Sequence, residues 1–326
     1  MVDFSKKHSI MNSDYSLMEV DLSTGTGFKI ENSEIAEQLA VMQKRELSHS
    51  TPCYEVLLKE CNEKIDTPSL DLQISWRRKI CLWAFRVADH FNLPREVVAT
   101  SMSHYDRFMA ILNRSGEERI SSRFVSLVSV TSLYLAAKVD QRRHIPITTF
   151  VTLCAGRYTM EDIICMEKHM ISVLEWKLHP PTQQTFVSLF LELMPAQEHL
   201  KNDLFERAQY NTEISLCSFE LSTYASSTVA MASIILALDA TSPDVIALKV
   251  RNQFLQNVMN ATELVIKPDD VQFVKDSILE IERLSGAQPC EGRKELAQQT
   301  SFQHPYDQSN RYTRNSNCTS PSDVTI

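Results

Sequence analysis

Glycine is scarce in this chain, with six residues among 326. Tight hairpin turns and phosphate-binding loops depend on glycine, because it adopts backbone angles that other residues avoid. The pair Gly25 and Gly27 lacks the Lys-Ser/Thr and the strand of a phosphate loop, so we interpret it as a linker. The composition therefore favours helices over a β-rich fold.

Basic charge is also in short supply, because 33 lysines and arginines face 41 aspartates and glutamates, giving a formal net charge of −8. Proteins that bind a phosphate backbone usually gather lysine and arginine into a net basic surface. The composition therefore predicts no direct contact with nucleic acid and favours a protein partner.

The eight cysteines contain no C-x-x-C pair. Zinc sites and disulfide frameworks usually show regular cysteine spacings, so we expect reduced thiols inside the cell, no metal site and no cofactor. The nine histidines show neither the H-E-x-x-H nor the paired Glu-x-x-His spacing. Their spacing argues against a metal-dependent helical enzyme.

Long hydrophobic runs are missing too. The longest apolar stretch, Val229–Leu238, is about half of the ~20 residues that a bilayer-spanning helix needs. Residues 1–30 lack the basic start and the apolar run of a secretion signal. We therefore expect a protein of the nucleus, the cytoplasm or both, without a membrane partner.

The sequence does contain a helical period of apolar residues. Its strongest stripe repeats with the spacing of one helix face and comprises Trp76, Ile80, Trp83, Val87 and Phe91. Such a stripe predicts an amphipathic helix that packs on neighbouring helices.

The segment 124–137 is apolar on nearly every side, with serine and threonine as its only polar residues. A helix of this composition is surrounded by other helices, so we expect it at the centre of its domain. Thr159, with a carboxylate close behind it, is the expected N-cap of a later helix. We expect the Pro180-Pro181 pair to end that helix.

After the proline pair the helical pattern starts again. Five helices are expected in this second half, over residues 186–194, 200–217, 226–238, 244–259 and 268–284. We therefore predict an all-α fold of two tandem five-helix domains with flexible extensions. The expected divisions are an N-terminal arm (1–32), a first domain with a preceding helix (33–180), a second helical domain (181–285) and a disordered tail (286–326).

Four charged residues lie in or beside the apolar stripes. Glu167 shares a face with large aliphatic residues, and Lys138 ends the most apolar helix. Arg77 and Asp106 lie beside the stripes of two earlier helices. A charge moved into a helix-packed interior costs several kcal/mol unless it is paired, so these charges are expected to be matched. Each also has a simple alternative, namely a helix C-terminus, a solvated edge or a structural ion pair.

Five ordered segments of this chain resemble the cyclin box. They are residues 76–83 (WRRKICLW), 104–108 (HYDRF), 133–140 (LYLAAKVD), 158–167 (YTMEDIICME) and 174–182 (LEWKLHPPT). The Lys-Ile variant in the first segment resembles D-type cyclins, although the L-x-C-x-E motif common near the start of that class is absent. The second domain is supported more by helix pattern than by motif.

The resemblance implies a kinase-binding role for the end of the apolar helix. In cyclins, a lysine and a glutamate at the positions of Lys138 and Glu167 form the pair that contacts the kinase, and the lysine bonds to main-chain carbonyls. Val139 and Asp140 are expected beside them in the contact. By the same resemblance, Arg77 and Asp106 match the family's internal ion pair.

The resemblance also implies a patch that docks substrates or inhibitors, formed here by Trp76, Lys79, Ile80, Trp83, Arg86 and Ser126. Cyclins usually carry a carboxylate at the position of Arg86, where it binds a basic residue of the docking peptide. Two cations, Lys79 and Arg86, would repel an Arg-x-Leu peptide, so we expect weak or altered docking.

The sequence therefore predicts a non-enzymatic regulatory subunit that binds and activates a cyclin-dependent serine/threonine kinase and controls cell-cycle progression. A transcription-related cyclin, or a cyclin-box adaptor acting outside the cell cycle, is the alternative. A two-box basal transcription factor is disfavoured, because such factors resemble DNA binders with an N-terminal zinc ribbon and this chain has neither cysteine pairs nor basic charge.

Overall fold

The computed structural model describes residues 26–49, 70–115, 121–140, 144–262 and 266–285. All regular secondary structure within these ranges is helical, which confirms the predicted all-α class. The predicted disordered tail and most of the predicted N-terminal arm lie outside the described residues. Residues 26–32 of that arm are helical, because the first helix begins at Thr26.

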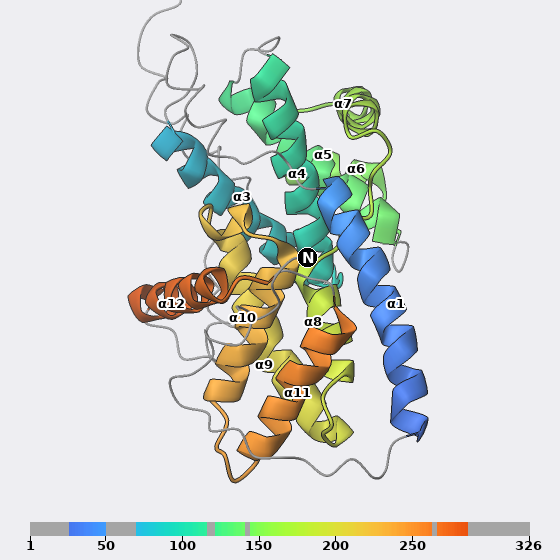
Figure 1. Cartoon of the computed structure of the whole chain (residues 1–326). Helices are drawn as coiled ribbons and strands as arrows, with labels where there is room; N and C mark the ends of the chain where they lie inside the picture. Colours follow the sequence, from blue (N-terminus) through green and yellow to red (C-terminus); the bar gives the residue numbers. More distant parts are fainter. Residues whose placement is uncertain (1–25, 50–69, 116–120, 141–143, 263–265, 286–326) are drawn as a thin grey trace, which may run out of the picture. The chain divides into compact units, whose positions relative to one another are not determined.

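The chain divides into two compact units. The described part of the first unit comprises residues 70–115, 121–140 and 144–180 and the short segment 216–219. Its helices are α3 (Leu70–His90), α4 (Glu96–Ser115), α5 (Ser122–Asp140), α6 (Ile147–Leu153) and α7 (Met160–Val173). Helix α5 contacts α4, α6 and α7, as its apolar sequence predicts for a central helix (Figure 1).

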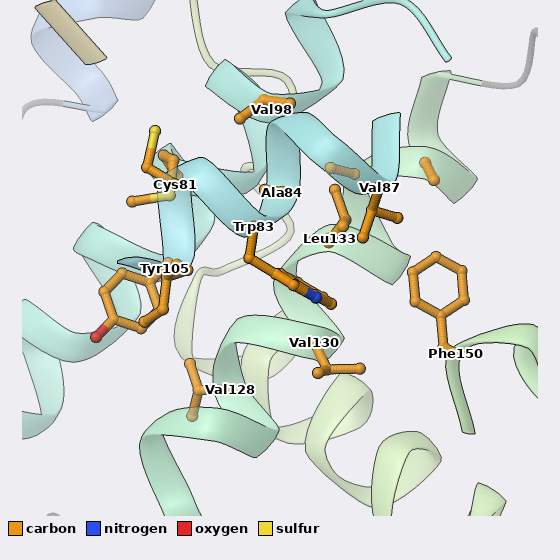
Figure 2. Packing of buried hydrophobic residues seen from close by; sticks show 14 of the residues in the cluster. Cys81, Trp83, Ala84, Val87, Val98, Tyr105, Val128, Val130, Leu133 and Phe150 are labelled. Carbon is orange, nitrogen blue, oxygen red and sulfur yellow. The ribbon is translucent and has the colours of Figure 1, made fainter. Parts of the chain in front are cut away.

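The core of the first unit forms where α3 packs on α5. Trp83 is 1% exposed, and Figure 2 shows its indole directed from α3 toward Val130 and Leu133 of α5. Phe150 of α6 is also fully buried in this cluster. These buried rings help to hold α3, α5 and α6 in place, because close-packed interiors tolerate few voids.

Helix α7 begins as predicted and ends earlier than predicted. Its N-cap is Thr159, whose hydroxyl accepts a hydrogen bond from the backbone of Asp162, while the Asp162 carboxylate accepts one from the backbone of Thr159. The helix stops at Val173, well before the proline pair, because Glu175 and Trp176 turn the chain with φ values of 52° and 61°. Such left-handed angles are strained for residues other than glycine.

Two buried side chains of α4 hold this strained turn. His104 Nε2 lies 2.9 Å from the carbonyl oxygen of Leu178, and Arg107 Nη2 donates a 2.7 Å hydrogen bond to that of Lys177. Burial lowers the pKa of His104 to about 4, so its imidazole is neutral and donates to the carbonyl. Burial also lowers the pKa of Arg107, to about 10, which leaves its guanidinium charged at neutral pH.

The second unit has a central apolar helix as well. Its later helices are α8 (Gln183–Glu192), α9 (Glu198–Cys217), the 3-10 turn η2 (Leu221–Thr223), α10 (Ser226–Asp239), α11 (Leu248–Ala261) and α12 (Pro268–Ser285). The last two residues of α9 belong to the first unit. Helix α10 is buried along most of its length and contacts α8 and α12. The five predicted helices are all present, although α11 begins four residues later than expected, after Ile246 has entered the core.

Helix α1 (Thr26–His49) packs on the second unit, where it lies beside α8 and α11 (Figure 1). Leu39 is 1% exposed in that core. The Glu46 carboxylate accepts hydrogen bonds from the Ser227 backbone N–H (2.9 Å) and hydroxyl (2.7 Å) at the start of α10. The sequence instead grouped this helix with residues 33–180, because nothing in its apolar spacing identifies the surface on which it packs.

We expect Trp83→Ala to destabilise the first unit by about 3–5 kcal/mol, because it empties a large volume in a rigid core. Trp176→Ala is the matched control, since Trp176 is 75% exposed, and it should change stability by less than about 0.5 kcal/mol. Urea unfolding followed by circular dichroism measures both effects. Equal effects of the two substitutions would contradict the packing described here.

We also expect the protein to lose stability as the pH falls from 6.5 toward 4. Unfolded His104 takes up a proton near its ordinary pKa of 6.5, whereas the folded residue resists it down to about 4, so protonation favours unfolding in this window. The loss is about 3 kcal/mol. His104→Gln keeps an N–H donor at similar reach and does not titrate, so its urea midpoint should fall less over this range. An identical pH profile for wild type and variant would show that His104 is not the cause.

Candidate functional site

An ion pair joins the last turn of α5 to the middle of α7. Lys138 Nζ lies 2.8 Å from Glu167 Oε1. The Lys138 side chain is 56% exposed, while that of Glu167 is 9% exposed. The ammonium also lies 5.6 Å from the centre of the Tyr134 ring. The pair therefore presents an ammonium group at the surface, and a buried carboxylate holds that group in position through a hydrogen bond.

The hydrogen bond to Glu167 raises the pKa of Lys138, so the ammonium stays charged throughout the physiological range. A lysine ammonium has three N–H donors, and the bond to Glu167 uses one of them. The geometry therefore suits the binding of carbonyl oxygens on another molecule. Because Glu167 holds the ammonium in place, little conformational entropy would be lost on binding.

The other two predicted kinase contacts, Val139 and Asp140, are the last residues of α5. Both side chains are half-buried. They follow Lys138 directly in the chain, so the structure brings all three to the same end of the helix.

Arg77 and Asp106 form a second ion pair, between α3 and α4. Arg77 Nε and Nη2 each donate a 2.9 Å hydrogen bond to the Asp106 carboxylate. Nη1 donates to the carbonyl oxygens of Leu216 (2.9 Å) and Ser218 (3.3 Å). The Arg77 side chain is only 2% exposed, so this pair serves the interior, where it ties α3, α4 and the segment 216–219 together.

The six residues expected to form a docking patch do not form a continuous exposed surface. Ile80, Trp83 and Ser126 are 2%, 1% and 1% exposed. Ile80 and Trp83 lie on the face of α3 that enters the core, which explains their burial. Trp76 and Arg86 are half-buried, and Lys79 is exposed. Three of the six residues are therefore buried in the core, while Lys79, Trp76 and Arg86 keep accessible surface, and the docking patch itself stays a prediction.

Sequence reasoning missed the role of His104 and Arg107, which hold the carbonyls of Leu178 and Lys177. Both belong to the HYDRF segment, yet only the resemblance drew attention to it. The sequence signal that could have revealed this role is a histidine and an arginine on the otherwise apolar face of a predicted helix. The turn that they hold displays Trp176, the most exposed large hydrophobic side chain of the described residues.

Within the described ranges, no group of three or more His, Cys, Asp or Glu residues is placed to hold a metal ion. In the same part of the chain, the helices are too short or too polar to cross a bilayer.

Comparison with known proteins identifies the family. Residues 40–179 match the family "Cyclin, N-terminal domain". Cyclin-A3-3 of Arabidopsis thaliana is 26% identical over 183 residues, which are 55% of this chain and 54% of the relative. G2/mitotic-specific cyclin-2 of Medicago sativa is 26% identical over 165 residues, which are 51% of this chain and 47% of the relative. The chain thus spans about half the length of these relatives.

The fold agrees with this match. A viral cyclin from herpesvirus saimiri superposes with a TM-score of 0.58 at 16% identity, over 76% of this chain and 99% of the viral one. A chain of the yeast TFIIK complex superposes with a TM-score of 0.50 at 15% identity, over 71% of this chain and 95% of the other. The specific likeness to D-type cyclins stays a prediction. Residues 40–179 are therefore a cyclin N-terminal domain, so this part of the chain is a cyclin box.

Proposed function

We propose that this chain is the regulatory subunit of a cyclin-dependent serine/threonine kinase, which it binds and activates to control cell-cycle progression. The observation that carries the proposal is the Lys138–Glu167 pair, an exposed ammonium fixed by a buried carboxylate at the end of the central helix. Such a pair offers preorganised donors to a partner's main-chain carbonyls. The ammonium is accessible although its partner is buried, so it can bind another molecule without losing the bond to Glu167.

An exposed aromatic side chain of the same unit also supports a protein partner. Trp176 is 75% exposed and lies in the turn directly after α7, with Leu178 half-buried beyond it. Aromatic side chains are enriched where proteins bind one another. We include Trp176 in the proposed kinase contact, in addition to Lys138, Val139, Asp140 and Glu167.

The proposed mechanism uses the cyclin as a rigid platform. Phosphoryl transfer by a protein kinase requires a lysine and a glutamate of the kinase's regulatory helix to be paired and the activation loop to be in place. A surface that binds this helix better in its active position shifts the kinase toward the active state. In this mechanism the cyclin supplies no catalytic group, metal or cofactor.

The setting of this activity is also part of the proposal. The names of the plant relatives include a mitotic cyclin, which favours a cell-cycle role in the nucleus, the cytoplasm or both. A transcription-related cyclin or a cyclin-box adaptor is the second candidate, because the cyclin fold alone does not distinguish it from a cell-cycle cyclin. The identity of the kinase that binds most tightly distinguishes the two.

We expect Lys138→Ala and Glu167→Gln each to weaken kinase binding by about tenfold or more, since each breaks a charge pair inside the contact. Biolayer interferometry against a panel of purified cyclin-dependent kinases measures the affinity, and phosphate transfer to a Ser-Pro peptide measures the activation. Lys168→Ala is the matched control, because Lys168 is exposed on α7 next to Glu167.

Circular dichroism melts must show that the variants are folded. Kinase binding that is unaffected by either substitution would remove the pair from the contact. If the folded wild-type protein neither binds nor activates any kinase of the panel, the proposed function is wrong.

We propose further that substrates or inhibitors carrying a standard Arg-x-Leu motif dock only weakly. Lys79 and Arg86 repel the basic residue of the peptide, and Ile80 and Trp83 are buried. The double variant Lys79→Ile, Arg86→Glu should bind a labelled Arg-x-Leu peptide about tenfold more tightly than wild type, because like charges are replaced by an attractive one. Fluorescence anisotropy makes the comparison. Equally tight binding by both proteins would contradict the charge argument.

A further inference from the structure

Two cysteines from distant parts of the sequence meet in the first unit. Cys81 Sγ on α3 lies 3.6 Å from Cys217 Sγ at the last residue of α9, across 136 positions of sequence. Cys81, labelled in Figure 2, is fully buried, while Cys217 is half-buried. A disulfide has an S–S length of about 2.05 Å, so the two sulfurs must approach by about 1.5 Å to bond.

The surroundings keep the two thiols together. Arg77 lies one helical turn before Cys81 and donates hydrogen bonds to the carbonyl oxygens of Leu216 and Ser218, the residues on either side of Cys217. The Asp106 carboxylate in turn fixes the guanidinium with two bonds. The backbone on both sides of the Cys217 thiol is therefore fastened to the helix that carries Cys81, so the two thiols stay close without a large search.

We propose that Cys81 and Cys217 form a reversible intramolecular disulfide when the protein meets a hydroperoxide, which makes this pair a site of redox modification. The link would join α3 covalently to the segment 216–219, where the Arg77 hydrogen bonds now hold it. Closing a loop of this length restricts the unfolded chain, so the oxidised protein should melt at a higher temperature than the reduced one.

The reaction has a defined order, because the two thiols differ in access. The half-buried Cys217 thiolate attacks hydrogen peroxide, the O–O bond breaks, and a sulfenic acid and hydroxide form. Cys81 then attacks the Cys217 sulfur, which forms the S–S bond and expels the sulfenic oxygen as a second hydroxide. The thiol protons neutralise both hydroxides, so two thiols and one peroxide yield one disulfide and two waters.

The environment of Cys81 suits the second step better than the first. Burial raises the pKa of the Cys81 thiol, which protects it from direct oxidation, while the Arg77 guanidinium partly opposes that rise. Cys81 should therefore react only with a neighbour that is already activated. The exposed Cys165 on α7 is a built-in competitor for the oxidant.

The test uses the full chain, reduced, freed of reductant and treated with increasing hydrogen peroxide. Tryptic mapping without reduction should detect the peptide of Cys81 joined to that of Cys217. The oxidised protein should migrate faster on a non-reducing denaturing gel, because a large loop is closed, and dithiothreitol should reverse the shift.

Cys217→Ser should abolish the faster band, and Cys165→Ser should retain it. The proposal is overturned if the wild-type Cys165 becomes fully oxidised while Cys81 stays reduced, or if Cys81 is found linked to any other cysteine. Mapping of the wild-type protein decides this even where a variant folds poorly. The outcome does not depend on kinase binding, so it stands or falls separately from the proposed function.

Discussion

The burial of α5 on all sides is the constraint on which the first unit depends. Eleven of its residues are buried, and α4, α6 and α7 pack around it. A helix enclosed in this way can present only its ends to a partner, because the rest of its surface is covered. Lys138 stands at the C-terminal end, where the core stops, and Glu167 of the neighbouring α7 fixes its position. The location of the proposed kinase contact thus follows from the packing that holds the unit together.

The two ion pairs have the same chemistry, but their cations differ in solvent exposure and therefore in role. In the Arg77–Asp106 pair the cation is 2% exposed, and every hydrogen bond described for its guanidinium is made inside the unit. In the Lys138–Glu167 pair the cation is 56% exposed and the carboxylate is the buried partner. Removing one member of a buried pair leaves an uncompensated charge, so the first pair fixes structure. The second keeps donors at the surface, which suits recognition.

The helices could be predicted from sequence because apolar spacing reports directly which face of a helix is buried. The same spacing cannot tell what covers that face, so it placed α1 with the wrong neighbours and left the contact of Glu46 with Ser227 unforeseen. The spacing assigned Trp83 to a packed face, whereas the resemblance assigned it to a docking patch, and the structure places the ring in the core. The charges at Arg77, Asp106, Lys138 and Glu167 stood out as costly in apolar stripes, yet spacing alone could not identify their partners. Pairing depends on helix packing, which emerges only in three dimensions.

The turn after α7 connects the interior of the unit to its proposed binding surface. Glu175 and Trp176 adopt left-handed angles that cost about 1–3 kcal/mol each, and such angles persist only where the surroundings determine them. His104 and Arg107 supply that determination, because hydrogen bonds from buried groups to the next two carbonyls are hard to exchange for water. The hydrogen bonds from α4 therefore offset this strain, and the turn that they hold exposes the Trp176 side chain at the end of α7. The buried His104 and the exposed Trp176 are therefore linked through the same turn, although they lie in separate motifs of the sequence.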